Sequence, residues 1–401
     1  MIPSLRLLAG ATFAAVGALT FVPAPTSSFL SASVVTTEFG HYLVAAAILV
    51  VFMPGWGRSV AGRLGALLGL AAVVLLVMPV VQATEMSRTL PDLVAARLGT
   101  AERPPAEFAD TRRPAPFALI ELIRPVRSTP VRYEARTFKD PEGERLAVDI
   151  YRPAYPHGPI PGVIVVHGES WESVGGSELV ALNGYLAARD FLVVSISDRL
   201  DPRRPFPGAR NDVISTIAYL KVHASELGLD PTRLAMLGRS VAGHLALLTA
   251  YTVNDPAIRG AISLYAPSDF ERWYTTAAER GVLDTRGILR DYLGGPPEGS
   301  RNVYDAASPI TFVRRETPAT LLVHGMHDQV VPPEQSERLD ARLEEAGVRH
   351  LLVRLPWATH GCDKNFAGPC GQITTYAIER FLNVVMRNPP AASPSRPRRS
   401  T

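Results

Sequence analysis

The chain has little of what small disulfide-built, metal-built or nucleic-acid-binding proteins are made from. Its 401 residues include only 2 cysteines, too few for a disulfide framework or a cysteine-based zinc site. The formal net charge is only +3, so the basic surface that nucleic acid requires is not expected. Lysine occurs only at positions 139, 221 and 364, and no internal repeat stands out. We therefore expect no nucleic-acid partner and no metal ion.

Hydrophobic residues, by contrast, make up 47% of the chain, and the longest apolar runs lie near the N-terminus. These runs cover 5–22, 39–53 and 64–83, and only the third reaches the roughly 20 residues that cross a bilayer unaided. The first is either a retained helix or a secretory signal peptide, and the second is either a membrane helix or a buried helix of a soluble domain. We predict a transmembrane region over 1–83 with three helices.

The charges between these runs predict an orientation. Arg58 and Arg63 lie in the loop at 54–63, whereas the loop at 23–38 contains neither lysine nor arginine. Positive loops stay on the cytoplasmic side, so the chain after residue 83 is expected on the other side, whether or not the first run is cleaved. The sequence thus predicts a multi-pass protein of the cell membrane, with membrane lipid around its helices.

Two further segments are rich in proline and charge. Residues 84–130 include AERPPAEFADTRRPAPF and are predicted to form a juxtamembrane linker. Within it, DLVAARLG and FALIELI are either short amphipathic helices on the membrane or the domain, or plain connecting helices. Residues 388–401, NPPAASPSRPRRST, cannot build a core and are predicted to be disordered. The main domain is expected between these segments, over 131–387.

Short apolar runs alternate with helical patterns throughout 131–387. Several runs are apolar almost throughout, as strands buried on both faces must be. The pattern predicts an α/β fold in which helices cover both faces of a mostly parallel, eight-stranded sheet. The predicted strands are VRYEARTF, RLAVDIY, GVIVVHG, FLVVSIS, RLAMLG, GAISLYAP, ATLLVHG and HLLVRLP.

The stretch GRSVAGHLA places Ser240 between a predicted strand and a predicted helix. A serine on such a turn points outward, beside the free N–H groups at the start of the helix, among them that of Val241. The alternative is an ordinary serine cap on a helix. The glycine usual two places after such a serine is replaced by Ala242. The motif alone therefore leaves both alternatives open.

A nucleophilic serine needs a base, and in this architecture the acid follows the serine and the histidine follows the acid. Asp328 follows the strand ATLLVHG, and His360 lies in the loop that leaves HLLVRLP. His350 instead begins that strand, at the opposite end of the sheet. We predict Ser240 as nucleophile, Asp328 as acid and His360 as base. The alternatives are that Asp328 is a turn carboxylate that caps the following helix and that His360 is a histidine of a surface loop.

A second source of backbone donors follows the strand GVIVV, in the loop HGESW. We predict that the N–H groups of Glu169 and Ser170 join that of Val241 in an oxyanion hole. The rest of this oxyanion loop consists of His167, Gly168 and Trp171. The alternative is a tight turn at the end of a strand, with the tryptophan merely packing.

Several segments together resemble the esterase and lipase branch of the α/β hydrolases, near the bacterial acetyl-esterase and feruloyl-esterase-like group. The resemblance covers about 131–387 and implies the roles given above to Ser240, Asp328 and His360. Asp212 matches a position that braces the fold in this family, so no catalytic role is assigned to it. The segments are HGESW, SISDRLDPRRPFPGARNDV, DPTRLAMLGRSVAGHLAL, HGMHDQVVPPEQSE and WATHG.

The chain departs from the family at three places. Glu169 stands where a second glycine is usual, and Ala242 replaces the last glycine of the nucleophile motif. Cys362 and Cys370, the only cysteines, replace an aromatic residue and a glycine in the loop after His360. Because that loop is expected outside the cytoplasm, we predict a disulfide between them; the alternative is two buried free thiols.

The resemblance implies a serine hydrolase that cleaves small-molecule or lipid esters through an acyl-enzyme on Ser240, without a cofactor. Residues 268–305, which include Phe270, Trp273, Tyr274 and Tyr292, either cap the pocket or form a packed helical excursion. Peptidase-like or lactonase-like chemistry is an alternative, because HGMHDQVVPPEQSE is similar to segments of those enzymes too. A membrane-tethered binding module with an inactive site is another.

Overall fold

The computed structural model describes residues 2–54, 59–100, 112–124, 130–155, 158–166, 179–196, 205–278 and 281–387. The eight predicted strands are all present and form a single sheet in the order β1-β2-β4-β3-β5-β6-β7-β8. β2 pairs antiparallel with β1 and β4, and all other neighbours pair in parallel. The strands are β1 Val131–Lys139, β2 Arg145–Pro153, β3 Ile160–Val166, β4 Leu192–Ile196, β5 Leu229–Arg239, β6 Ile258–Leu264, β7 Ala319–Gly325 and β8 His350–Leu355.

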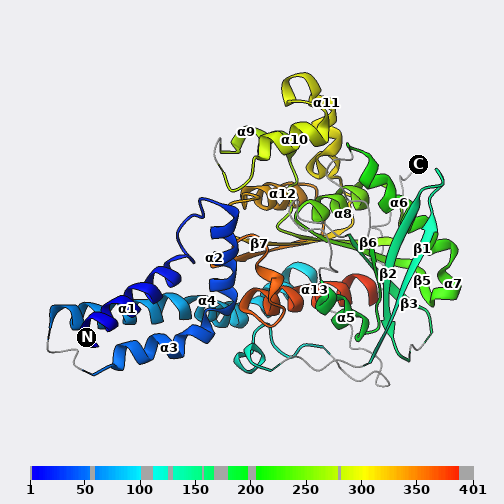
Figure 1. Ribbon diagram of the computed structural model, residues 1–401. Helices are drawn as coiled ribbons and strands as arrows, with labels where there is room; N and C mark the ends of the chain where they lie inside the picture. Colours follow the sequence, from blue (N-terminus) through cyan, green and yellow to red (C-terminus); the bar gives the residue numbers. More distant parts are fainter. Residues whose placement is uncertain are drawn as a thin grey trace, which may run out of the picture.

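Helices cover both faces of this sheet, as predicted (Figure 1). Strands β3 and β4 are buried along their whole length, which explains their unbroken apolar sequences. One face packs against α5 and α13, and the other against α6, α7, α8 and α12. The helices are α5 Val180–Ala187, α6 Gly208–Val222, α7 Ala224–Leu227, α8 Ser240–Thr252, α12 Glu334–Glu345 and α13 Pro369–Arg387.

The insertion between β6 and β7 forms a helical layer of its own beside the sheet (Figure 1). Its aromatic side chains Phe270, Trp273 and Tyr292 are buried against one another, with Tyr274 partly buried at the margin. The cluster also includes Val330 and Val331, which follow Asp328. These rings therefore pack a helical excursion. Its elements are α9 Phe270–Thr276, α10 Thr285–Leu293, α11 Pro297–Ala307 and the 3-10 turn η2 Pro309–Phe312.

The N-terminal region is an arm of helices that projects from the sheet domain (Figure 1). Each predicted apolar run falls in a helix, but the segment 23–38, expected to be a loop, contains an additional helix, α2. Its sequence, SSFLSASVVTTEF, mixes polar and β-branched residues and so gives no clear helical period. The helix begins at Thr26, whose side chain accepts the N–H of Phe29. The arm contains α1 Ile2–Ala18, α2 Ser27–Phe39, α3 His41–Phe52 and α4 Val60–Leu98.

Only part of the arm is long and apolar enough to cross a membrane. By length and composition, α4 qualifies alone, and α2 with α3 qualifies only as one broken span, bent by 82°. α1 is apolar but shorter. Among the described residues, one or two candidate spans thus stand where three were predicted.

The predicted linker over 84–130 is wrong in its first part, because α4 continues to Leu98. At 1.5 Å per residue its 39 residues extend about 58 Å, nearly twice the thickness of a bilayer core. Leu90, Val94 and Leu98 recur every four residues on one face of the helix and join the cluster under the sheet. The second half of α4 is therefore a core helix of the sheet domain.

Residues 112–124 also pack on the domain. The guanidinium of Arg113 is buried and donates to the carbonyl oxygen of Gln372, while its backbone N–H donates to the carboxylate of Glu379. A short 3-10 turn, η1 Leu119–Leu122, buries Leu122. The described part of the predicted linker is docked, since its polar groups find partners on α13.

Candidate active site

Ser240 lies at the sharp turn where β5 ends and α8 begins, with φ at +51°. Non-glycine residues rarely adopt such a conformation, which is the strain expected of a nucleophile turn. A side chain on Gly238 would run into the backbone of Ala242, and one on Gly243 would lie 2.8 Å from Cβ of Ala266. Ala242 itself is fully buried in an apolar cluster. The close approaches thus fall at Gly238 and Gly243, which explains why position 242 accommodates a methyl group.

The three residues predicted to act together lie in one hydrogen-bonded row. His360 Nε2 is 3.0 Å from Ser240 Oγ, and His360 Nδ1 is 2.7 Å from Asp328 Oδ2. Asp328 follows β7 and His360 follows β8, so parallel strands bring all three to one edge of the sheet. The expected hydrogen bond between Ser240 and His360 is therefore present. His350 begins β8, at the opposite edge.

Asp328 is built to stay ionised. Its side chain is fully buried, and burial alone would raise the pKa of the carboxyl. The charge of His360 and hydrogen bonds from His324 and His360 outweigh burial, so the pKa of Asp328 lies well below its ordinary value. The other oxygen, Oδ1, accepts the backbone N–H groups of Val330 and Val331, both at 2.9 Å. A fixed carboxylate of this kind holds the imidazole in one orientation.

The predicted oxyanion loop, His167 to Trp171, lies outside the described residues, and with it the predicted donors Glu169 and Ser170. Val241 occupies the first turn of α8, where backbone N–H groups have no partner within the helix. It stands directly beside Ser240. Of the three predicted donors, Val241 alone lies within the described residues, and its role in an oxyanion hole stays a prediction.

The loop after His360 carries the predicted bridge. Cys362 and Cys370 form a disulfide whose Cα atoms are 5.7 Å apart, and both residues are buried. The bridge joins the 3-10 turn η3 Cys362–Lys364 to the first turn of α13. The segment that follows the histidine is therefore closed into a short covalent loop.

Three residues without any assigned role complete the surroundings of His360. The ring of Tyr265 meets the ring of His360 edge to face, with centroids 4.7 Å apart, and φ of Tyr265 is +42°. Its hydroxyl donates to Asp363, and Asp363 also pairs with Arg239 at 3.5 Å. Arg239 directly precedes the serine, and Asp363 closely follows the histidine. This ion pair joins the serine turn to the histidine loop. The one sign of it in the sequence is that Arg239 lies in the serine motif and Asp363 lies just after His360.

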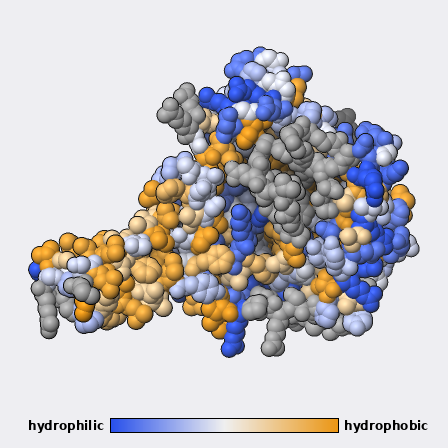
Figure 2. Space-filling model, in the orientation of Figure 1, coloured by the Kyte–Doolittle hydropathy of each residue, from blue (hydrophilic) through white to orange (hydrophobic). Residues whose placement is uncertain are grey.

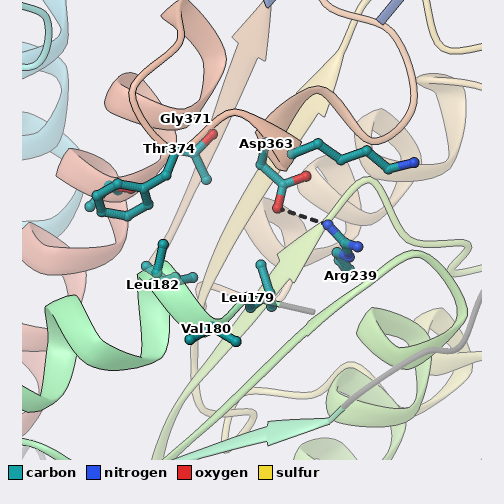
Figure 3. A pocket seen from close by; sticks show the side chains of 11 residues that line it. Leu179, Val180, Leu182, Arg239, Asp363, Gly371 and Thr374 are labelled. Atoms are coloured by element: carbon teal, nitrogen blue, oxygen red, sulfur yellow. Dashed lines mark hydrogen bonds and ion pairs between the residues drawn. The ribbon is translucent and has the colours of Figure 1, made fainter. Parts of the chain in front are cut away.

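A cavity of about 360 Å³ lies beside the ion pair (Figure 3). Leu179, Val180 and Leu182 line one side of it, and Arg239 and Asp363 face each other across another (Figure 3). Its volume lies within the range of pockets that hold small organic ligands. The cavity thus combines an apolar wall with a polar one.

Elsewhere in the described ranges, no cluster of three or more histidine, cysteine or carboxylate side chains is arranged to hold a metal ion. His244, one turn after Ser240, is fully buried, and burial lowers its pKa to about 4. Its Nε2 lies 2.6 Å from the carbonyl oxygen of Ala307. This neutral histidine packs α8 against the insertion through Phe270.

Fold, strained serine turn and acid–histidine row together define an α/β hydrolase. A family model described as BD-FAE matches residues 148–343. Esterase LipC of Mycobacterium tuberculosis is 32% identical over 252 residues, which cover 58% of this chain and 60% of that protein. Esterase LipQ of the same organism is 28% identical over 279 residues, 63% of each chain. The chain thus spans about three-fifths of the length of these relatives. The chain thus has the α/β-hydrolase fold and is similar in sequence to the esterase and lipase family of these proteins.

Solved structures agree on the fold. A hyperthermophilic esterase from the archaeon Pyrobaculum calidifontis matches with a TM-score of 0.55 at 21% identity, over 64% of this chain and 87% of that one. The thermostable carboxylesterase EstE1, cloned from a metagenomic library, matches with a TM-score of 0.53 at 24% identity, over 65% of this chain and 91% of that one. Both matches cover about the share of the chain occupied by the sheet domain and its insertion.

Proposed function

We propose that the protein hydrolyses carboxylic esters through an acyl-enzyme on Ser240. The observation that carries this proposal is the row Ser240–His360–Asp328, with its two hydrogen bonds of 3.0 and 2.7 Å. Two of its relatives are named esterases, which supports an ester bond as the bond that is cleaved. The names of the relatives concern the bond that is cleaved, and the proposal adds the serine mechanism for this chain.

In the proposed reaction, His360 Nε2 takes the proton of Ser240 as Oγ attacks the ester carbonyl carbon. The carbonyl oxygen becomes an oxyanion, which the N–H of Val241 stabilises together with the predicted donors at 169–170. The ester C–O bond then breaks, and His360 returns the proton to the leaving alkoxide. Water attacks the acyl-enzyme by the same steps and releases the carboxylic acid. Asp328 stays ionised and orients the imidazole throughout.

We also propose that the arm anchors the enzyme in a membrane. Large apolar side chains are exposed along it, among them Leu49, Phe52 and Leu67, and the arm is largely orange in Figure 2. α1 and α4 approach through small residues, since a side chain on Gly65 would lie 2.6 Å from the backbone of Leu7. Close packing at small residues is typical of helices in lipid.

The charges of the arm support an extracytoplasmic sheet domain, with the loop at 54–63 on the cytoplasmic side. The disulfide is consistent with that location, because disulfides persist in oxidising compartments. Protease added to spheroplasts tests the orientation. Degradation of the sheet domain in intact spheroplasts is expected, and its survival until the cells are lysed would contradict the proposal.

Hydrolysis of p-nitrophenyl esters by the full chain in detergent micelles tests the chemistry. Turnover is expected for the wild-type chain, and a loss of about 10⁴-fold or more for Ser240→Ala. A panel of acyl chains from acetate to palmitate then defines the substrate. Equal rates for the wild type and Ser240→Ala would exclude the proposed mechanism.

A further inference from the structure

Helix α2 stands where the arm meets the sheet domain (Figure 1), and the segment around it contacts both loops that complete the triad. On the acid loop, the backbone N–H of Ala24 donates to Gln329 Oε1 at 2.6 Å. His327 Nδ1 lies 3.3 Å from the carbonyl oxygen of Thr20. His327 and Gln329 are the two chain neighbours of Asp328. The arm therefore holds the acid loop on both sides of the catalytic carboxylate.

On the histidine loop, the contact is made by Glu38, near the end of α2. Glu38 is fully buried, and its Oε2 accepts the backbone N–H of Cys370 at 3.1 Å. Its carbonyl oxygen accepts from the side-chain amide of Asn365 at 2.9 Å. One residue of the arm is thus bonded twice to the segment that leaves His360.

The hydrogen bond that Glu38 accepts from Cys370 falls at the start of α13, next to the disulfide. Cys370 lies in the first turn of α13, where backbone N–H groups lack partners within the helix. The same cysteine closes the disulfide loop that follows His360. Glu38 therefore caps α13 from a distant part of the chain and ties down the far end of the histidine loop.

The fit around this carboxylate is close. A side chain on Gly368 would collide with Oε2 of Glu38 and with the side chain of Asn365, the two groups that join α2 to the histidine loop. Oε2 is also the oxygen that accepts the backbone N–H of Cys370, in the segment that leaves His360. The geometry makes the position of Glu38 and the path of the loop mutually dependent.

We propose that Glu38 is a positioning residue for the triad, through which the N-terminal arm holds His360 against Ser240. This inference rests on the proposed esterase function. It makes the arm a part of the active site rather than only an anchor. Loss of the Glu38 carboxylate is expected to slow the chemical step without weakening the binding of a small substrate.

The test uses the full chain in detergent micelles with p-nitrophenyl acetate. Glu38→Ala is expected to lower kcat about 10-fold to 100-fold and to leave KM within about 2-fold. Glu38→Gln keeps an oxygen that accepts the N–H of Cys370, so kcat is expected to stay within about 3-fold of the wild type. Rescue by glutamine separates positioning from the mere loss of packing.

The matched control is Glu379→Ala, at a carboxylate that is equally buried on α13. Glu379 accepts from Arg113 and Tyr185, away from the histidine loop. Its loss is expected to lower the melting temperature at least as much as Glu38→Ala does, with kcat within about 3-fold of the wild type. Equal falls of kcat in both variants would overturn the inference, since they would mark a general effect of stability.

If Glu38→Ala does not fold, Gly368→Ala provides the same test from the opposite side. Its methyl group is expected to displace the carboxylate and lower kcat, whereas Gly184→Ala, in open space on α5, leaves kcat unchanged. A wild-type kcat in Glu38→Ala or in Gly368→Ala would overturn the inference alone. An inactive wild type would overturn the proposed function as well, so the two failures are distinguishable.

Discussion

The nucleophile and the two residues that serve it are held in different ways. Ser240 stands on a turn fixed by β5, α8 and two close glycine contacts, all within the sheet domain. Asp328 and His360 lie in loops that the distant N-terminal arm holds through Ala24 and Glu38. The first arrangement is local in sequence and the second is not. The comparison suggests that the nucleophile turn is independent of the arm, while the acid and base depend on it.

The largest expected effect comes from the base itself. His360→Ala should lower kcat by about 10⁴-fold to 10⁶-fold, because Ser240 then has no proton acceptor. Asp328→Ala should cost about 10⁴-fold, because the imidazole loses its orientation. Hydrolysis of p-nitrophenyl acetate measures both. A loss below about 10-fold in either variant would show that the observed row does not carry the chemistry.

A smaller effect is expected on the nucleophile side, from the glycine contacts. Gly243→Ala puts a methyl group 2.8 Å from Cβ of Ala266 and should lower kcat/KM about 10-fold to 100-fold by shifting the turn. Ala242→Gly removes a methyl group that is buried in an apolar cluster. It should cost about 1 kcal/mol of stability and keep activity within about 3-fold. The opposite ranking of the two variants would place the critical contact at residue 242.

The covalent loop should affect stability more than catalysis. Replacing Cys362 and Cys370 together by alanine should lower the free energy of unfolding by about 2 kcal/mol, because the denatured chain gains freedom. Chemical denaturation measures this change. Dithiothreitol should destabilise the wild type similarly and leave the double variant unaffected. A response of the double variant to reductant would mean that the reagent acts elsewhere.

The smallest expected effect lies at the opposite end of β8 from the triad. A hydrogen bond from His350 Nε2 to the carboxylate of Asp340, 3.2 Å away, raises the pKa of His350 above its ordinary value. The resulting stabilisation is complete below about pH 6.5 and is lost as the pH rises through the raised pKa. The free energy of unfolding should fall by less than about 1 kcal/mol over that range. His350→Gln should abolish this slope and leave kcat unchanged.

Asp340, the acid of the same pair, makes a contribution to stability that depends on pH in the opposite direction. His350 and Arg354 help to lower the pKa of Asp340 against the effect of burial. Its contribution is therefore complete above about pH 4 and is lost as the pH falls through the lowered pKa. Denaturation curves of the wild type and of Asp340→Asn from pH 3 to 8 measure it. Parallel curves for the two proteins would show that the pair contributes nothing.

The sheet and the triad could be predicted from the sequence because their signals are local. The inner strands are short apolar runs, and Ser240, Asp328 and His360 each follow one of them. Parallel pairing then brings them together without further information. The two glycines that make the close approaches, Gly238 and Gly243, stand in the same motif as Ala242, so part of the packing at the turn is also visible in the sequence.

The arm could not be predicted in the same way, because its roles depend on contacts between distant residues. Glu38 and Cys370 are separated by 332 positions, and nothing in the sequence around either one indicates the other. Leu90, Val94 and Leu98 lie on one helical face that packs on the sheet domain, but the proline-rich stretch that follows them in the sequence favours a linker. Local composition therefore predicted a tether where the structure has core packing.

Labelling of the serine tests the central claim most directly. The full chain, in detergent micelles, is exposed to a fluorophosphonate probe, which reacts with a serine that has an active base. We expect one label per chain on Ser240 in the wild type, detected by intact-mass and peptide spectrometry, and none in Ser240→Ala. A folded wild type that takes up no probe, or a Ser240→Ala variant that labels equally well, would contradict the account and favour a binding module with an inactive site.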